Sequence, residues 1–283
     1  MKPITDNNDN TNTREWSLYP SGGPGRELKA GLSTKKLMIG GMINEYSRPS
    51  LAKIYKEAGY DFLFIDYEHL FFDFESLYDT ILAARAYGLP PIAKTPQLER
   101  AEVAKLLDSG IVGIQLPRTE SKEQIKELIS YMKFPPHGTR AIAGNLGNSD
   151  YVPVSDWRKW MKDQDEETTV VVHIETKLGY QNAEEIISTP EVDMVYVGPG
   201  DFSIEMGHPG DWTHPDILIP MKEILEICNK YNVAFGTTPG NPEITKELMK
   251  KGMRFVEDGG ELGFITKGAQ EKVKSYRKIL TDN

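Results

Sequence analysis

The chain is poor in the features that mark secreted and membrane proteins. It has a single cysteine, Cys228, among 283 residues, so an internal disulfide framework is excluded. Its apolar runs all fall short of the roughly 18 residues that a membrane-spanning helix needs. The polar start of the chain lacks the apolar stretch of a secretory signal. We therefore expect a cytoplasmic protein with no membrane partner, and we expect Cys228 to be a small core residue on a helix.

Positive charge is also scarce. The chain has 42 acidic and 33 basic residues, which gives a formal net charge of -9. Because a phosphate backbone is bound by a basic face, this balance argues against nucleic acid as the main partner. The length is sufficient for one domain with a core of its own and leaves little room for a second.

What the chain does have is a repeated strand-then-helix rhythm. Residues 1–25 are polar and predict a loose tail, and residues 26–283 predict a single domain. The strand segments are short and continuously apolar, as expected where both faces are buried. They are residues 36–43, 61–66, 90–95, 113–117, 170–175, 193–199, 233–239 and 254–260. Eight such units favour a closed (β/α)₈ barrel of the α/β class, with an open doubly wound sheet as the alternative.

One connection is unusually long. Roughly 30 residues separate the fourth helical segment from the fifth strand segment, and they include Arg140, Tyr151, Trp157 and Trp160. Long loops in compact domains are usually lids or contact surfaces. We expect this one to pack over the barrel mouth or against another subunit, and the sequence does not choose between the two.

Acidic residues end two of the strongly apolar segments. Glu175 is the last residue of the fifth segment, and Asp201 follows the sixth in a Gly-Pro-Gly-Asp turn. In a barrel, the C-terminal ends of the strands form the active-site face. Two hard oxygen ligands on neighbouring strands suit a divalent cation such as Mg²⁺ or Mn²⁺. Glycine in the turn allows backbone N–H groups to approach a ligand closely.

The second strand segment delivers a third polar group to the same face. It ends in Asp66, followed by Glu68 and His69. A histidine with a nearby carboxylate can serve as a general base. Beside a cation, its natural task is to remove a proton next to the carbonyl of a 2-oxo acid, while the cation stabilises the enolate. The three segments together therefore predict a metal-dependent, enolate-forming enzyme.

The sequences of these segments resemble the motifs of a known family. IDYEH, HIET and GPGDFS, in this order, are similar to the I-D-x-E-H, Q-I-E-T and G-P-x-D-L-S motifs of the HpcH/HpaI aldolase/citrate lyase family, in its 2-oxo-acid aldolase branch. The resemblance covers nearly the whole chain after the tail. It implies a (β/α)₈ barrel whose last helix packs on a neighbouring subunit, in a homo-oligomer that is a trimer or a hexamer. It also implies a Mg²⁺, Mn²⁺ or Co²⁺ cofactor, with a 2-oxo acid such as pyruvate and an aldehyde as substrates.

The resemblance also assigns roles to residues. It implies Glu175 and Asp201 as metal ligands and His69 as the base, paired with Asp66. Backbone groups around Pro199 and Gly200 would hold the carboxylate of the 2-oxo acid.

Several positions depart from the family pattern. Lys94 stands where the third strand usually ends in an arginine, and a lysine cannot make the planar two-pronged contact of a guanidinium. His173 replaces a usual glutamine and is expected to donate to the substrate or to act as a third metal ligand. Arg118, where an apolar residue is more usual, either supplies the missing guanidinium or is a surface residue. We place Thr238 with Arg118 and His173 among the substrate-binding candidates, and Glu261 replaces a common aspartate.

These departures leave several hypotheses about the function open. The leading one is a metal-dependent lyase of the class II aldolase type that forms or cleaves a C–C bond through an enolate. The second is a metal-dependent decarboxylase of a 2-oxo diacid, and the third is a metabolite-binding homologue without turnover. A Schiff-base aldolase using Lys94 is less favoured, because a Schiff base needs no metal and the acid pair is retained.

Overall fold

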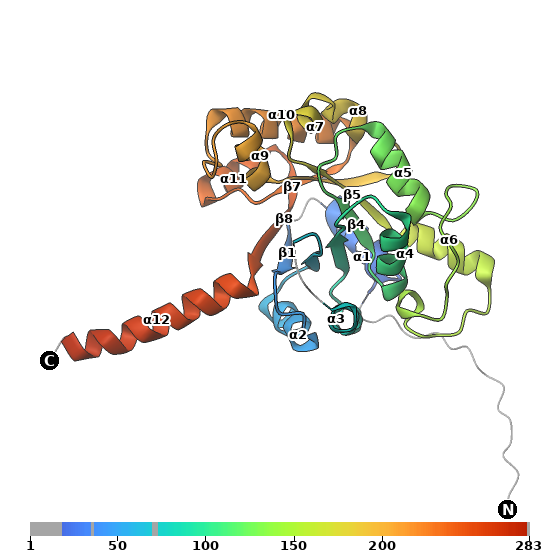
Figure 1. The fold of residues 1–283 in the computed structure, drawn as a ribbon, viewed down its shortest axis with the longest axis horizontal. Coiled ribbons are helices and arrows are strands. Elements are labelled where there is room, and N and C mark those ends of the chain that lie inside the picture. Colours follow the sequence, from blue (N-terminus) through green and yellow to red (C-terminus); the bar gives the residue numbers. More distant parts are fainter. Residues whose placement is uncertain (1–18, 35–36, 70–72, 282–283) are drawn as a thin grey trace, which may run out of the picture.

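Eight parallel strands close into a barrel. The computed structural model describes residues 19–34, 37–69 and 73–281. Neighbouring strands pair in sequence order, and β8 pairs back to β1, so the closed barrel is confirmed and the open sheet is wrong (Figure 1). The strands are β1 (Met38–Ile43), β2 (Phe62–Asp66), β3 (Pro91–Lys94), β4 (Gly113–Leu116), β5 (Thr169–Ile174), β6 (Val192–Val197), β7 (Ala234–Thr237) and β8 (Met253–Gly260).

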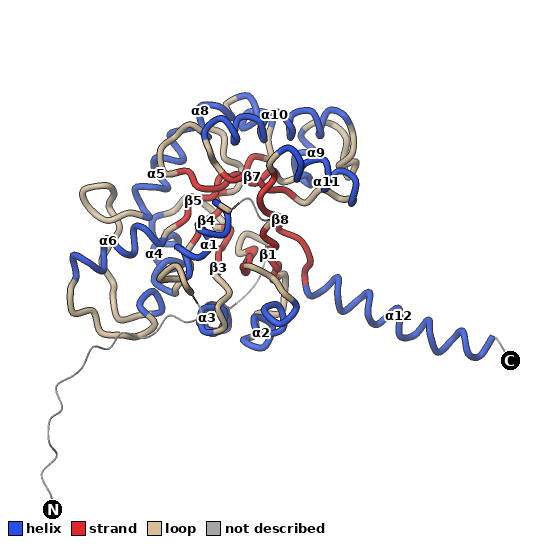
Figure 2. Tube along the Cα trace, turned by 180° about the vertical axis from the view of Figure 1, so that it is seen from behind, coloured by secondary structure: helices blue, strands red, loops and turns tan. Residues whose placement is uncertain are grey.

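Helices surround the barrel and follow the strands along the chain (Figure 2). They are α1 (Pro24–Ser33), α2 (Pro49–Ala58), α3 (Phe74–Ala86), α4 (Arg100–Ser109), α5 (Lys122–Met132), α6 (Trp157–Glu167), α7 (Lys177–Gln181), α8 (Ala183–Ile187), α9 (Pro199–Glu205), α10 (Pro215–Tyr231), α11 (Pro242–Lys251) and α12 (Glu261–Thr281), with a short 3₁₀ turn η1 (Gly147–Ser149). Cys228 is buried on α10, as expected. None of the helices described is both long enough and apolar enough to span a membrane.

The strands carry two different cores on their two faces. Side chains alternate along a strand, so every second residue points into the barrel. The outward set packs against the helices in one large apolar cluster that includes Ile65, Ala93, Ile114 and Val195. The inward set forms a second cluster with fewer residues, which fills the barrel interior.

Helix α1 closes the N-terminal end of the barrel and was not predicted. Its Leu28 and Leu32 belong to the same interior cluster as Phe62 and Phe255. Tyr19 is also buried, so the packed part of the chain begins before residue 26, while residues 1–18 of the expected tail lie outside the described part.

The long connection lies at the N-terminal end of the barrel, so the expectation that it covers the mouth is wrong. Its Asp150 pairs with Arg85 at the end of α3, and its Arg140 lies 3.7 Å from Asp108 at the end of α4. Both helices run from the mouth toward the base, so these contacts fix the connection at the base. Packing against another subunit stays a prediction.

Helix α12 leaves the barrel and extends alone (Figures 1 and 2). Its first residue, Glu261, is buried, and its carboxylate accepts hydrogen bonds from the backbone N–H groups of Asn44, Glu45 and Tyr46. Glu261 therefore opens the helix and holds the loop after β1, rather than lying on the eighth strand. The residues after it on α12 are exposed along the helix as far as residue 280.

Candidate active site

The inward-facing residues change from apolar to polar toward the C-terminal end of the barrel. On β2 the inward positions run Phe62, Phe64, Asp66, and on β3 they run Ile92, Lys94. Strands β5 and β8 repeat the pattern, with Val171 followed by His173 and then Glu175, and Phe255 followed by Glu257. Because side chains alternate with a period of two, an apolar start on each strand brings these polar groups to one level at the mouth.

Lys94 is held between two carboxylates. Its Nζ lies 3.1 Å from Asp66 and 3.0 Å from Glu68, and its side chain is 8% exposed. Burial alone would lower the pKa of Lys94, but the charges of Asp66 and Glu68 outweigh burial and raise that pKa above its usual value. Lys94 is therefore a fixed ammonium, which disfavours its use as a Schiff-base nucleophile.

The partner of the His69 ring is Glu68. Nε2 of His69 lies 3.4 Å from Glu68, whereas Asp66 accepts a hydrogen bond from the backbone N–H of His69 at 3.3 Å. The expected pairing of the imidazole with Asp66 is thus wrong, because Asp66 is taken up by Lys94 and the backbone. The His69 side chain is 58% exposed and stands at the mouth.

Glu175 is a buried carboxylate that forms no ion pair with a lysine or an arginine of the described residues. It accepts a hydrogen bond from the backbone N–H of Arg118 at 2.8 Å, and its other oxygen lies 3.1 Å from Nε2 of His173. Burial raises the pKa of Glu175 to about 7, the Arg118 N–H and Lys94 oppose that rise, and the negative charges of Asp201 and Glu68 add to it. A bound cation would relieve this unfavourable burial.

Asp201 completes the pair that the sequence predicts. It lies in the first turn of α9, is exposed, and is close enough to Glu175 for its charge to act on that carboxyl. Two carboxylate oxygens with room for solvent and substrate suit Mg²⁺ or Mn²⁺, which are often held by one or two protein carboxylates. The donor set therefore fits the implied cation.

His173 lies on the inner side of Glu175. It is buried, and burial followed by the charges of Lys94 and His69 holds its pKa well below the usual value, so the imidazole is neutral. Its Nδ1 lies 3.3 Å from the amide nitrogen of Gln115. When Nδ1 accepts a hydrogen bond from the Gln115 amide, the neutral imidazole carries its proton on Nε2, facing Glu175.

The remaining predicted residues lie around this centre. The Arg118 guanidinium points to Glu205, at 3.5 Å, and is exposed, so only its backbone N–H meets the candidate centre. The Thr238 hydroxyl lies 2.7 Å from the hydroxyl of Tyr196. Pro199 and Gly200 open α9, where N–H groups of the first turn have no partner inside the helix. The substrate-binding roles of these residues stay predictions.

Sequence reasoning missed four residues of the centre: Gln115, Glu257, Tyr196 and Gly198. A side chain on Gly198 would place its Cβ 2.2 Å from Nε2 of His173, so glycine is required there by close approach. Gln115 and Glu257 are polar residues at inward positions of otherwise apolar strands, 0% and 1% exposed. That pattern in the sequence was the signal that could have found them.

A second cluster of ligand-type residues lies in the loop after α9. His208, His214 and Asp216 bring their side-chain atoms within 4.8 Å of one another. The two rings are stacked, with centroids 3.4 Å apart and planes 17° apart. Lone pairs lie in the ring planes, so parallel rings do not aim them at one ion, and we assign no metal here.

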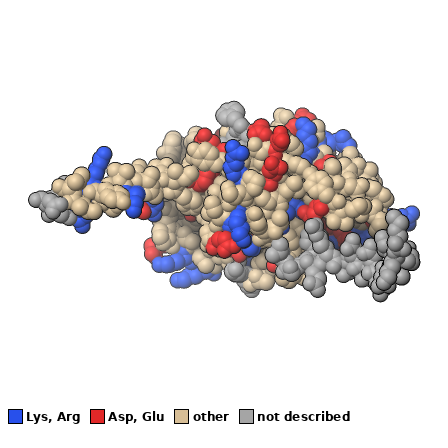
Figure 3. All heavy atoms as spheres, turned by 90° about the horizontal axis from the view of Figure 1, so that it is seen from below, with Lys and Arg blue, Asp and Glu red and all other residues tan. Residues whose placement is uncertain are grey.

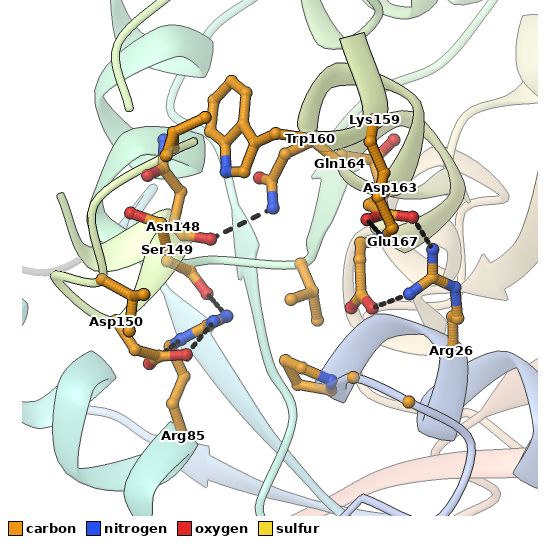
Figure 4. A pocket seen from close by; sticks show the side chains of 18 of the residues that line it. Arg26, Arg85, Asn148, Ser149, Asp150, Lys159, Trp160, Asp163, Gln164 and Glu167 are labelled. Atoms are coloured by element: carbon orange, nitrogen blue, oxygen red, sulfur yellow. Dashed lines mark hydrogen bonds and ion pairs between the residues drawn. The ribbon is translucent and has the colours of Figure 1, made fainter. Parts of the chain in front are cut away.

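A cavity of about 340 Å³ lies at the opposite end of the barrel (Figure 4). It is bordered by α1, α6 and the long connection. Arg26 pairs with Asp163 and Glu167 across it, and Arg85 pairs with Asp150. These ion pairs join the connection to the barrel base, far from the residues that the sequence predicts for chemistry.

Comparison with known proteins confirms the resemblance drawn from the motifs. The family model for HpcH/HpaI aldolase/citrate lyase matches residues 41–267. A hydroxypyruvate/pyruvate aldolase of Chromohalobacter salexigens is 30% identical over 227 residues, which cover 80% of this chain and 88% of that protein. A 5-keto-4-deoxy-D-glucarate aldolase of Shigella sonnei is 25% identical, with 89% of this chain and 97% of that protein covered.

The fold agrees with solved structures as well. The crystal structure of an HpcH/HpaI aldolase from Desulfitobacterium hafniense superimposes with a TM-score of 0.83 at 27% sequence identity, and the match covers 88% of this chain and 96% of that chain.

Two glycines beside the candidate metal ligands should respond differently to alanine. Gly198→Ala forces His173 and Glu175 to move, and we expect it to lower the free energy of unfolding by about 1–3 kcal/mol, the usual cost of overpacking. Gly200→Ala has open space around the new methyl group and should stay within about 0.5 kcal/mol of the wild type. Urea unfolding of both variants tests this. Equal stabilities would contradict the close approach at Gly198.

Proposed function

This chain belongs to the HpcH/HpaI aldolase/citrate lyase family, and we propose that it is a divalent-metal-dependent lyase that forms or cleaves a C–C bond next to a 2-oxo acid. The nucleophile is the enolate of pyruvate or a related 2-oxo acid, and the electrophile is an aldehyde. Carbon–carbon lyase chemistry accords with the family and with the names of the relatives. The metal, the residue roles and the assembly rest on the arguments below.

The metal assignment depends on a difference between two pairs of carboxylates at the mouth. Asp66 and Glu68 form ion pairs with a lysine, whereas Glu175 and Asp201 form none with a lysine or an arginine of the described residues. The ammonium of Lys94 contacts both Asp66 and Glu68. Glu175, near Asp201, has backbone and neutral imidazole partners instead, and its pKa is raised to about 7. Like charges brought together at a buried site favour a cation there. A Mg²⁺, Mn²⁺ or Co²⁺ ion held by Glu175 and Asp201 would polarise the 2-oxo group and stabilise the enolate charge.

Other residues of the chain would orient the metal ligands and bind the substrate. The Arg118 N–H and His173 orient Glu175. Lys94 supplies a fixed positive charge near the substrate oxygens, in place of the arginine of typical relatives. The N–H groups of Gly200 and Asp201, at the start of α9, would bind the carboxylate of the 2-oxo acid.

His69 is the proposed base, because its imidazole is exposed at the mouth and has a carboxylate, Glu68, beside the ring. It takes a proton from C3 of the 2-oxo acid, directly or through a water molecule. Glu68 keeps the ring oriented.

The aldehyde has room on the side of the mouth next to Thr238. A cleft of about 650 Å³ lies there, bordered by Trp212, Asn241, Lys246 and Asp258 together with Thr238. This cleft mixes an aromatic wall with hydrogen-bonding and charged groups, which suits a polar aldehyde. We also place the protein in the cytoplasm, in keeping with its single cysteine.

Helix α12 supports assembly of several copies. Apolar side chains recur along it at three- and four-residue spacing and are exposed, among them Ile265 at 56%, Tyr276 at 60% and Leu280 at 78%. On the face in Figure 3 the helix is an arm of mostly uncharged surface with a few Lys and Arg side chains. An apolar stripe of this length on an isolated helix needs a partner surface. We propose that it packs on a neighbouring copy in a trimer or hexamer.

Removing either metal ligand should abolish cation-dependent turnover. Glu175→Gln and Asp201→Asn should each weaken Mn²⁺ binding by more than the roughly 10- to 100-fold cost of losing an outer-shell partner. Electron paramagnetic resonance of free Mn²⁺ measures the affinity, and excess chelator should stop turnover of the wild type. Asp216→Asn, in the second cluster, is the matched control and should bind normally. Full activity in chelator would refute the metal assignment.

Loss of the base should slow proton removal. In D₂O with pyruvate and Mg²⁺, His69→Ala should exchange the C3 protons about 10²- to 10⁴-fold more slowly than the wild type, as followed by proton NMR. His137→Ala, an exposed histidine on the long connection, should leave the rate unchanged. If His69→Ala exchanges at the wild-type rate, the base lies elsewhere, and His173 becomes the next candidate.

The lysine at the arginine position has its own test. Lys94→Ala should lose about 3 kcal/mol of transition-state stabilisation, the scale for one electrostatic donor. Lys94→Arg should hold or raise pyruvate aldol activity if the site is an ordinary aldolase with a weakened clamp, and should impair the native activity if the lysine serves a different reaction. Borohydride with pyruvate should trap nothing on Lys94. A wild-type rate in Lys94→Ala would instead point to Arg118.

Negative charge on the exposed apolar side of α12 should disrupt the oligomer. The double variant Ile265→Glu/Tyr276→Glu should sediment as a smaller species than the wild type, because it would bury two carboxylates at the interface. Lys267→Glu/Lys274→Glu changes charge on the opposite side of the helix and should keep the wild-type size. A monomeric wild type, or a double variant of unchanged size, would contradict the role of α12.

A further inference from the structure

Two residues that border the cavity at the barrel base each have a buried polar atom without a hydrogen-bond partner among the described residues. The two atoms are Oδ1 of Asn148, on η1, and the indole Nε1 of Trp160, on α6. A buried carbonyl or N–H group without a partner destabilises a fold, so each of these atoms calls for an explanation. The cavity itself, at about 340 Å³, is large enough for one small molecule.

The side chain of Asn148 is fixed with its carbonyl oxygen unused. Its amide nitrogen donates to the carbonyl oxygen of Ala143 at 2.7 Å and to Oδ1 of Asp108 at 3.2 Å. Because both amide hydrogens are used, turning the amide over would break two hydrogen bonds. The neighbouring Gly147 lies so close to the end of α4 that a Cβ there would be 2.2 Å from the carbonyl oxygen of Ser109. The turn that carries Asn148 is therefore held firmly against the barrel.

The ring of Trp160 is held by two aromatic neighbours. Its centroid lies 5.5 Å from that of Phe134 and 5.6 Å from that of Trp157, which meets it edge to face. In Figure 4 the nitrogen of the Trp160 ring points from α6 toward the cavity. An indole N–H group donates and cannot accept, so its partner must offer a lone pair.

The charged side chains around the cavity already have partners. They form ion pairs with one another or accept hydrogen bonds from the backbone. The ion pairs are Arg26–Asp163, Arg26–Glu167, Lys159–Asp163 and Arg85–Asp150, and Asp156 caps α6. An ionic ligand would break one of these pairs or lie buried without a counter-charge. The cavity therefore favours an uncharged molecule.

Much of the remaining wall is apolar. It is formed by Pro24, Ile111, Val112, Val152 and Val154. Water alone would satisfy the two polar atoms but would leave this apolar surface wet, and a purely apolar molecule would leave the two polar atoms unpaired. An apolar wall with a few polar groups is the usual composition of a small-molecule site.

We propose that this cavity is a second binding site, for a small uncharged molecule that carries an amide group with a free N–H, such as a lactam. Its carbonyl oxygen accepts a hydrogen bond from the indole N–H of Trp160, its N–H donates to Oδ1 of Asn148, and its carbon skeleton covers the apolar wall. The site lies at the opposite end of the barrel from Glu175 and Asp201, so the proposal does not rest on the proposed function.

Two lactams that differ by one methyl group test this directly. 2-Pyrrolidone has both the carbonyl and the N–H, and N-methyl-2-pyrrolidone lacks the N–H. Each is titrated into full-length protein labelled with ¹⁵N-tryptophan, and NMR follows the indole N–H signals, of which the Trp160 signal is the one lost in Trp160→Phe. We expect 2-pyrrolidone to move this signal to saturation and to bind about 5- to 100-fold more tightly than its methylated form, because the latter leaves Asn148 unpaired.

The other signals locate the probe. Trp212 borders the cleft beside Thr238 at the mouth, and its signal should stay in place. A Trp160 signal that does not move, or equal binding of the two lactams, would overturn the proposal.

Variants add a second, independent measurement. A ligand that binds the folded state raises the melting temperature, so 2-pyrrolidone near its half-saturating concentration should raise that of the wild type more than its methylated form does. Trp160→Phe removes the N–H, keeps an aromatic ring and should lose most of this difference. Trp157→Phe is the matched control, because it makes the same change on a neighbouring ring of α6 that is 41% exposed, and it should keep the difference.

The melting curves decide between the outcomes. Equal losses in Trp160→Phe and Trp157→Phe would overturn the proposal. If Trp160→Phe does not fold, the comparison of the two lactams on the wild type decides by itself, and equal effects of both would overturn the proposal.

The second site and the proposed function can fail separately. Glu175→Gln, which should lose the metal, should still respond to 2-pyrrolidone as the wild type does. A response that is lost in Glu175→Gln would place the probe at the mouth and overturn the second site without affecting the metal assignment. Lactam binding at Trp160 in a protein that shows no pyruvate C3 exchange would refute the proposed aldolase function and leave the second site standing.

Discussion

The alternation of side chains along a closed barrel is the constraint on which this site depends. Each strand can send every second residue inward, and the interior is filled from the base by α1 and by rings such as Phe62 and Phe255. The charged and imidazole groups on the inward positions, Asp66, Lys94, His173 and Glu257, lie above that filling, toward the ends of the strands. The chemistry at the mouth is therefore a consequence of where the apolar layer stops on each strand.

Charge compensation then decides what each carboxylate can do. Lys94 is close to Asp66 and Glu68, and its raised pKa keeps it a cation. Within the described part of the chain, the partners of Glu175 are a backbone N–H and a neutral imidazole, and burial, with the nearby charges of Asp201 and Glu68, works against its ionisation. The pair Asp66 and Glu68 already has a counter-charge, and the pair Glu175 and Asp201 does not. The two pairs therefore differ in what they can bind.

Much of this could be predicted from the sequence, and the failures have physical reasons. Glu175 and Lys94 were predictable because they end apolar strands, and strand ends of a parallel barrel share one face. The meeting of Gln115 with Glu257 was not, because contacts across a barrel depend on strand tilt and stagger. The choice of Glu68 over Asp66 as the partner of the His69 ring was not either, because it follows from the contact of Asp66 with Lys94 on the next strand. The position of the long connection before β5 was predicted wrongly, because loop length indicates a contact surface without saying at which end of the barrel it lies.

A lysine at position 94, where the resemblance leads us to expect an arginine, fits the rest of the mouth. A guanidinium makes a planar fork and can share itself between a protein carboxylate and a substrate, whereas an ammonium is a compact point charge. Here the charge of Lys94 is already shared between Asp66 and Glu68. The guanidinium of Arg118, the other cationic candidate for this site, lies beside Glu205. Protein cations therefore leave the mouth with a surplus of negative charge. An anionic 2-oxo acid is repelled by such a surface until a divalent ion is present, so under the proposed function the cation is needed to admit the substrate as well as to activate it.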